Sequence, residues 1–186
     1  MERVRAFIAV DFNDVEIVNG ILMLQNRITS IGTDIKFVEK ENLHITLKFL
    51  GEVPHDVIIN IQKVLSGIKF KPFSVTVKGL GVFPNYRNIR IVWIGIEEGV
   101  DKLKSLQNNI EEKLLVLGFK REKDFTPHLT IGRIRTGRNK DKLINVLNEF
   151  RDFTFGKQLI DVFHLKKSIL TSKGPIYNNL YSIKAT

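Results

Sequence analysis

A repeated order of predicted elements constrains the fold of this 186-residue chain more than any other feature of its sequence. A strand, a long helix, a strand that carries a histidine and a second helix are predicted in residues 4–68, and the same order recurs in roughly 89–150. Several hairpins are predicted as well, and this mixture favours an α+β fold over a doubly wound parallel sheet. The repeat predicts two similar lobes, each with an antiparallel sheet and helices, that face each other across a cleft. Because no long linker separates the lobes, we expect residues 1–186 to form a single bilobal domain.

Local patterns predict the individual elements of the repeat. Apolar residues alternate between Val4 and Phe12 with the two-residue period of a strand. Asp14 is positioned to cap a helix that runs to about Ile31 and carries apolar residues at helical spacing. Near the C-terminus, the turn-forming segment 171–175 predicts a hairpin between the last two strands.

Composition excludes several classes of protein. The sequence has no stretch of about 18 uncharged apolar residues, so no membrane span is predicted, and its N-terminus lacks the pattern of a secretory signal. Cysteine is absent, which excludes disulfides, thiolate nucleophiles and cysteine-based metal sites. These features favour a cytoplasmic protein.

The balance of charge indicates the class of partner. Lys and Arg number 29 against 20 Asp and Glu, which gives a formal net charge of +9. Surplus positive charge attracts polyanions and favours a nucleic-acid or nucleotide partner, although a generically basic protein would show the same balance.

Each half of the repeat carries a strand tetrad of histidine, apolar residue, threonine and apolar residue. His44 and Thr46 lie on one face of the first strand, because side chains alternate along a strand. His128 and Thr130 are placed in the same way in the second half. Each strand therefore offers an imidazole and a hydroxyl about 7 Å apart, while its other face is apolar.

Paired imidazoles of this kind are suited to phosphate chemistry. One neutral imidazole can take a proton while a charged one donates a proton, and hydroxyls can hold phosphate oxygens without adding charge. Two histidines that flank one phosphate could open a phosphodiester without a metal. The alternative is a pair of structural histidines. One tetrad alone would carry little weight, but two at equivalent points of a repeat favour a site.

These motifs resemble those of a known family. The sequence is similar to the two-histidine phosphoesterase superfamily and, within it, to the RNA 2′,3′-cyclic phosphodiesterases, also called 2′-5′ RNA ligases. The similar segments are distributed along nearly the whole chain: residues 5–10, 43–51, 81–84, Trp93, 125–133 and 174–177.

The resemblance implies a bilobal fold in which each lobe presents one tetrad to a shared cleft. It also implies hydrolysis of a 2′,3′-cyclic phosphate at an RNA end to a 2′-phosphomonoester. In that scheme His128 is the general base for water, and His44 is the general acid that protonates the leaving 3′ oxygen. Thr46 and Thr130 would hold the non-bridging oxygens. With a 5′-hydroxyl in place of water, reversal would join RNA ends through a 2′-5′ linkage.

Two further residues are candidate substrate ligands. Lys48 shares the strand parity of His44, so it would extend the phosphate-facing row unless it is a solvated lysine at the strand end. Arg133 has the opposite parity to His128, but Gly132 could kink or bulge the strand and redirect it. The resemblance favours contact between Arg133 and the nucleotide.

Other chemically interesting residues are interpreted as structural. Arg87 and Arg90, near Tyr86, could form a basic wall for RNA, but an ordinary loop is the simpler interpretation. Phe49 is expected in the core, and His164 is expected to have no role. No pair of histidines has the helical spacing of zinc ligands, so neither a metal nor a cofactor is predicted.

Three functions fit these features. The first is a metal-independent enzyme, acting as a monomer on RNA with 2′,3′-cyclic phosphate ends, such as tRNA fragments, in RNA processing. The second is a non-catalytic basic RNA-binding module. The third is a relative of the first that acts on 2′-5′ linkages or on a small cyclic nucleotide.

Overall fold

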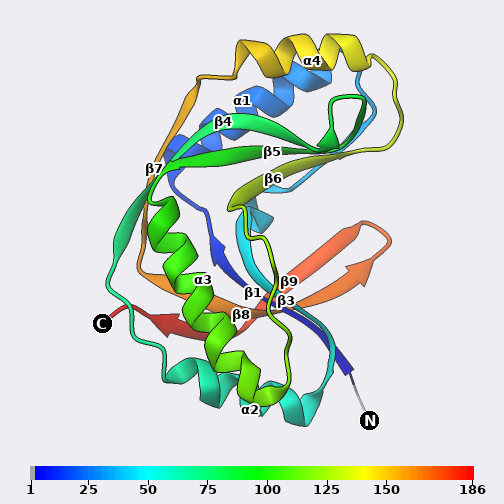
Figure 1. Cartoon of the computed structure of the whole chain (residues 1–186). Helices are drawn as coiled ribbons and strands as arrows, with labels where there is room; N and C mark the ends of the chain where they lie inside the picture. The colour runs from blue at the N-terminus through cyan, green and yellow to red at the C-terminus, as the bar shows by residue number, and fades with distance from the viewer. Residues whose placement is uncertain (1–2) are drawn as a thin grey trace.

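Two antiparallel sheets form the framework of the molecule. The computed structural model describes residues 3–186. Its strands are β1 (Arg3–Asp11), β2 (Ile35–Phe37), β3 (His44–Pro54), β4 (Phe73–Asn85), β5 (Asn88–Glu98), β6 (His128–Ile134), β7 (Thr154–Ile160), β8 (Val162–Thr171) and β9 (Gly174–Lys184). One sheet has four strands in the order β3-β1-β8-β9, and the other has five in the order β2-β6-β5-β4-β7. This architecture confirms the predicted α+β class (Figure 1).

Four α-helices cover the sheets in residues 3–186: α1 (Val15–Ser30), α2 (His55–Ser66), α3 (Val100–Leu114) and α4 (Lys140–Glu149). The predicted cap of α1 is confirmed, because Asp14 Oδ1 accepts hydrogen bonds from the backbone N–H groups of Glu16 and Ile17, at 2.9 and 3.2 Å. The predicted C-terminal hairpin is confirmed as well, since β8 and β9 pair from Val162 to the turn at Thr171. None of the helices in the described part of the chain has the length and apolar character needed to cross a bilayer.

The long helices are exchanged between the two sheets. Helix α1 packs on β7 of the five-stranded sheet, where Gly20 lies against the ring of Phe155, and it contacts α4. Helix α3 packs on β3 of the four-stranded sheet and beside α2. Figure 1 shows α1 and α4 above the five-stranded sheet and α2 and α3 around the other. The two repeat segments are therefore not the two lobes, because each lobe combines elements from both segments.

The histidine strands share an irregularity in their pairing. Between β3 and β1, Ile8 lies opposite Lys48 and Ala9 opposite Thr46, so that Leu47 is left without a partner on β1. Between β6 and β5, the same shift leaves Ile131 unpaired between Gly132 and Thr130. A bulge of this kind reverses the alternation of side chains beyond it. In both strands, the side chains that follow the tetrad therefore lie on the opposite face from the one that strict alternation predicts.

A buried side chain satisfies the backbone at the second bulge. The carbonyl of Ile131 accepts hydrogen bonds from the Val38 backbone N–H at 3.0 Å and from Gln25 Nε2 at 3.3 Å. Gln25 is buried on α1 and also donates to the Val38 carbonyl at 3.0 Å. Helix α1 therefore holds the strand that carries His128 through this side chain, since leaving the buried Ile131 carbonyl without a partner would be costly.

Candidate active site

His44 lies at the start of β3 with its ring fixed by the backbone and by aromatic neighbours. Its Nδ1 is 2.7 Å from the Asn42 carbonyl oxygen. A carbonyl can only accept a hydrogen bond, so Nδ1 carries a proton and Nε2 is left for other partners. The rings of Phe7 and Tyr177 lie 5.2 and 5.3 Å from the imidazole, centroid to centroid, and Tyr177 meets it edge-on.

His128 repeats this arrangement at the start of β6. Its Nδ1 is 2.7 Å from the carbonyl oxygen of Thr126, again two residues earlier in the chain. Phe83 meets the imidazole edge-on at 5.0 Å, and Trp93 lies at 5.9 Å. The two imidazoles are thus held in the same tautomer, each with Nε2 as the atom available to substrate.

The threonines of the tetrads follow their histidines on the same faces. Thr46 and Thr130 are half-buried, like the two histidines. Within residues 3–186, no side-chain hydrogen bond engages either hydroxyl. Both hydroxyls are therefore available to a ligand as donors, and the role that the resemblance implies for them stays a prediction.

The local electrostatics connect His44 with groups from several strands. Burial lowers the pKa of His44 below its ordinary value of 6.5, and the charges of Lys166 and His128 lower it further. The hydrogen bond to Asn42 and the carboxylate of Asp11 act in the opposite direction. The charge of His128 thus reaches His44 from the other sheet.

A partly buried ion pair lies beside His44 in the four-stranded sheet. Asp11 is opposite His44 in the register of β1 and β3. Lys166, which is buried, donates to both carboxylate oxygens of Asp11 at 2.7 Å. His164 Nε2 is 3.7 Å from Asp11 Oδ2, and burial lowers the pKa of His164 as well. His164, for which the sequence predicted no role, therefore belongs to the charged group of side chains around His44.

Lys48 does not continue the row of His44 and Thr46. Because the bulge at Leu47 reverses the alternation, Lys48 points to the opposite face and is only 4% exposed. Its Nζ lies 3.0 Å from Glu111 Oε1 on α3 and 2.6 Å from the Lys120 carbonyl. The placement of Lys48 predicted from strand parity is wrong.

The same reversal brings Phe49 and Arg133 to the faces that carry the histidines. Phe49 is 65% exposed, with its ring 6.3 Å from that of Phe7, so its predicted place in the core is wrong. Arg133 occupies the equivalent position on β6 and is exposed. Its positive charge acts on Tyr177, whose pKa is nevertheless raised by burial. Since Tyr177 contacts His44, Arg133 lies near the first histidine as well as on the strand of the second.

Five aromatic residues around the imidazoles were not identified as candidate site residues from the sequence: Phe7, Phe49, Phe83, Trp93 and Tyr177. All five lie at positions that carry the family resemblance, but no periodicity indicates which sheet face they share with a histidine. The strand register that would have identified them is visible only in the structure, where Trp93 is directly opposite Thr130.

The described residues contain no cluster of three or more His, Asp or Glu side chains that could hold a metal ion. Asp11 and His164 lie close together, but Lys166 already donates to both carboxylate oxygens of Asp11. The prediction that the reaction needs no metal stays a prediction.

Comparisons with known proteins identify the family and the relatives of this chain. The family described as the AKAP7 2′5′ RNA ligase-like domain matches residues 6–185. A protein of Archaeoglobus fulgidus named RNA 2′,3′-cyclic phosphodiesterase is 42% identical over 177 residues, which cover 95% of this chain and 97% of that protein. One of the same name from Methanothermobacter thermautotrophicus is 38% identical over 180 residues, with 96% and 97% covered.

The fold is also that of a solved structure, LigT of E. coli complexed with 3′-AMP. The TM-score is 0.78, with 24% sequence identity and with 100% of this chain and 99% of that chain covered. The chain therefore belongs to the 2′-5′ RNA ligase-like family of two-histidine phosphoesterases, and its curated relatives at about 40% identity are named RNA 2′,3′-cyclic phosphodiesterases.

Proposed function

We propose that this protein hydrolyses 2′,3′-cyclic phosphate ends of RNA to 2′-phosphomonoesters, with His44 and His128 as the acid–base pair. The observation that carries the proposal is the matched pair of imidazoles, each held by an Nδ1 hydrogen bond of 2.7 Å to a backbone carbonyl. Equivalent fixation on two different sheets is what an acid and a base on opposite sides of one phosphorus require. The names of the relatives supply the chemical class of the substrate.

The proposed reaction is a single displacement at phosphorus. His128 Nε2 takes a proton from water as the water oxygen bonds to phosphorus. The bond from phosphorus to the 3′ oxygen breaks, and His44 donates its Nε2 proton to that oxygen. Thr46 and Thr130 hold the non-bridging oxygens, on which negative charge increases. The phosphate remains on the 2′ oxygen, and a 5′-hydroxyl that takes the place of water gives a 2′-5′ linkage by the same displacement.

The acid role of His44 requires a proton that burial disfavours in the free protein. A bound cyclic phosphate brings a negative charge next to the imidazole, which raises the pKa of a histidine. The carboxylate of Asp11 already acts in this direction. Substrate binding would thus supply the protonated form of His44 that the leaving oxygen needs.

A substrate with sulfur in place of the leaving 3′ oxygen tests this assignment. A thiolate leaves without protonation, so His44→Gln should lose at least 100-fold in kcat/KM on the oxygen substrate and recover most of it on the sulfur substrate. His128→Gln should lose activity on both substrates, because its proton is taken from water. His55→Gln, at an exposed histidine on α2, is the matched control and should resemble wild type.

Three results would overturn the proposal: retained turnover in either site variant, equal rescue of both variants by sulfur, or loss of turnover in EDTA that added divalent metal restores. Binding of RNA without turnover by the wild-type protein would instead support a non-catalytic RNA-binding module. The monomeric state, a cytoplasmic location and tRNA fragments as substrates stay predictions.

A further inference from the structure

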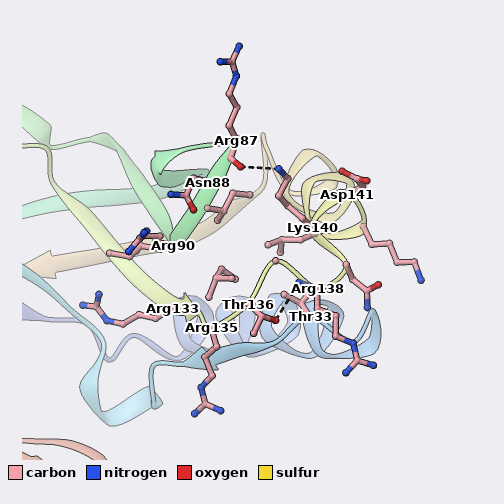
Figure 2. A pocket seen from close by; sticks show the side chains of 17 residues that line it. Thr33, Arg87, Asn88, Arg90, Arg133, Arg135, Thr136, Arg138, Lys140 and Asp141 are labelled. Carbon is pink, nitrogen blue, oxygen red and sulfur yellow. Dashed lines mark hydrogen bonds between the residues drawn. The ribbon is translucent and has the colours of Figure 1, made fainter.

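A strongly cationic hollow lies at the end of the five-stranded sheet. It has a volume of about 1150 Å³ and is formed by the β4–β5 turn, the ends of β5 and β6, and the segment that leads into α4 (Figure 2). Neither His44 nor His128 lines it. Its arginines are Arg87, Arg90, Arg133, Arg135 and Arg138.

We propose that this cationic hollow binds the ribose-phosphate backbone of the RNA strand on the 5′ side of the cyclic phosphate. The inference rests on the proposed function, because it assigns the hollow to the body of the same substrate whose end the histidines process. The ligand is a single strand of RNA, recognised through its phosphates.

The positive charges that line the hollow are not balanced by carboxylates that line it. Together with Lys140 and Lys142, the five arginines make seven cations against the single carboxylate of Asp141, a local net charge of +6. The whole chain carries +9. Within residues 3–186, none of the seven forms an ion pair, whereas elsewhere Arg27 lies 2.9 Å from a carboxylate oxygen of Glu149. Clustered like charges repel one another, so a polyanion that neutralises them is the ligand that fits.

The type of cation favours phosphate over a less specific acidic partner. Five of the seven are arginines, whose planar guanidinium binds two phosphate oxygens at once. The hollow also exposes the side chains of Ile91 and Ile134, so that a ribose or base could lie against an apolar surface between the charges.

The walls of the hollow are held in place before any ligand binds. Lys140 Nζ donates to the Arg87 carbonyl at 3.0 Å and joins α4 to the β4–β5 turn, as Figure 2 shows. Asn85 Oδ1 accepts from the Arg87 backbone N–H at 3.0 Å and shapes that turn. Asn139 Nδ2 donates to the Ile31 carbonyl at 2.8 Å and ties the segment before α4 to the end of α1. A rigid site loses less conformational entropy on binding.

Arg133 connects the hollow to the histidines. It lines the hollow, and it lies on β6 five residues after His128, which is roughly 16 Å along a strand. Its charge also acts on Tyr177, which contacts His44. A strand whose 3′ end lies between the imidazoles would pass Arg133 and enter the hollow after a few nucleotides. A cyclic mononucleotide would not extend to Arg135 and Arg138.

This difference in reach defines the experiment. We compare kcat/KM for a 2′,3′-cyclic mononucleotide with that for an oligoribonucleotide of about eight nucleotides that ends in a cyclic phosphate. Arg135→Gln/Arg138→Gln should lose at least tenfold on the oligonucleotide and stay within twofold of wild type on the mononucleotide. For the oligonucleotide, log kcat/KM should fall with log salt concentration. Losing two phosphate contacts should make this negative slope shallower by about 1.4.

Lys102→Gln/Lys104→Gln is the matched control, because it removes two exposed cations from α3, on the other lobe. Thermal unfolding of each variant verifies that it is folded. If wild type turns over both substrates and the arginine variant turns over the oligonucleotide like wild type, the inference about the hollow is wrong while the proposed function stands. An equal loss in the lysine variant would also overturn it, since the effect would then be one of overall charge. No turnover of either substrate by wild type would remove the proposed function itself.

Discussion

Replacing Lys48 by methionine should destabilise the protein without removing a substrate ligand. The ammonium group of Lys48 lies between the four-stranded sheet and α3, where its side chain is 5% exposed and that of its partner Glu111 is 2% exposed. Methionine keeps the apolar stem but leaves the Glu111 carboxylate buried without a cation. Gln107 Nε2 and the Glu122 backbone N–H, at 3.0 and 3.3 Å, are then its remaining donors.

The expected magnitude follows from this burial. Breaking a buried ion pair by removing one partner costs about 3–5 kcal/mol, because the other charge stays desolvated. Because two donors to the Glu111 carboxylate remain, we expect the cost of Lys48→Met to lie near the lower end of this range, at ~3 kcal/mol. For a chain of this length each kcal/mol lowers Tm by about 2–4 °C, so the fall in Tm should be roughly 6–12 °C. Lys48→Met/Glu111→Gln should recover more than half of the loss, since the amide oxygen keeps both donors and the only carboxylate left without Lys48, that of Glu122, is 40% exposed.

Urea unfolding and cyclic-phosphate turnover, measured at a temperature where all variants are folded, distinguish the two interpretations of this lysine. If Lys48 is structural, the double variant stays within about twofold of wild-type kcat/KM. If Lys48 contacts the phosphate, both variants lose a charge-assisted hydrogen bond of about 1.5–3 kcal/mol, roughly 10- to 100-fold in kcat/KM. That loss, or a double variant as unstable as the single one, would refute the structural interpretation.

Two further predictions concern stability. The pKa values of His44 and His164 are lowered from 6.5 in the folded state, so the unfolded chain binds more protons below that pH, and the free energy of unfolding should fall as pH decreases from about 6.5. Urea titrations should show a smaller fall in His44→Gln/His164→Gln, and an unchanged slope would contradict the argument. Gly81→Ala should cost about 1–3 kcal/mol, because the added methyl group would overlap the Trp93 ring, whereas nothing lies near a methyl group at Gly137, the control. Thermal melts measure both variants, and equal Tm values would count against the clash.

The features predicted correctly from the sequence are those that depend on local periodicity. The buried stripe of α1 is one, with Ile17, Ile21, Leu24 and Ile28 all at most 1% exposed. The cap at Asp14 is another. In both cases the residues that form the pattern lie three or four positions apart within one element, so their spacing in the sequence already contains the geometry.

Register was the first feature that periodicity could not supply. Strict alternation places Lys48 beside His44, but the unpaired Leu47 reverses the faces, and an unpaired residue depends on the neighbouring strand rather than on local sequence. The equivalent bulge on β6 gives Arg133 the position that Phe49 has on β3. Gly132 was a reasonable signal of irregularity near Arg133, yet β3 has no glycine at the corresponding point.

The exchange of helices was the second such feature, because an amphipathic stripe does not indicate which sheet it will cover. The exchange bears directly on the proposed chemistry, which needs two imidazoles on different sheets at a fixed separation. Lifting α1 from the five-stranded sheet would expose four buried aliphatic side chains, at about 1.5–3 kcal/mol each. The sum, roughly 6–12 kcal/mol, is comparable with the whole stability of a typical domain. Releasing α1 from its sheet would therefore unfold most of the molecule, so the sheet that carries His128 keeps this helix as long as the protein is folded.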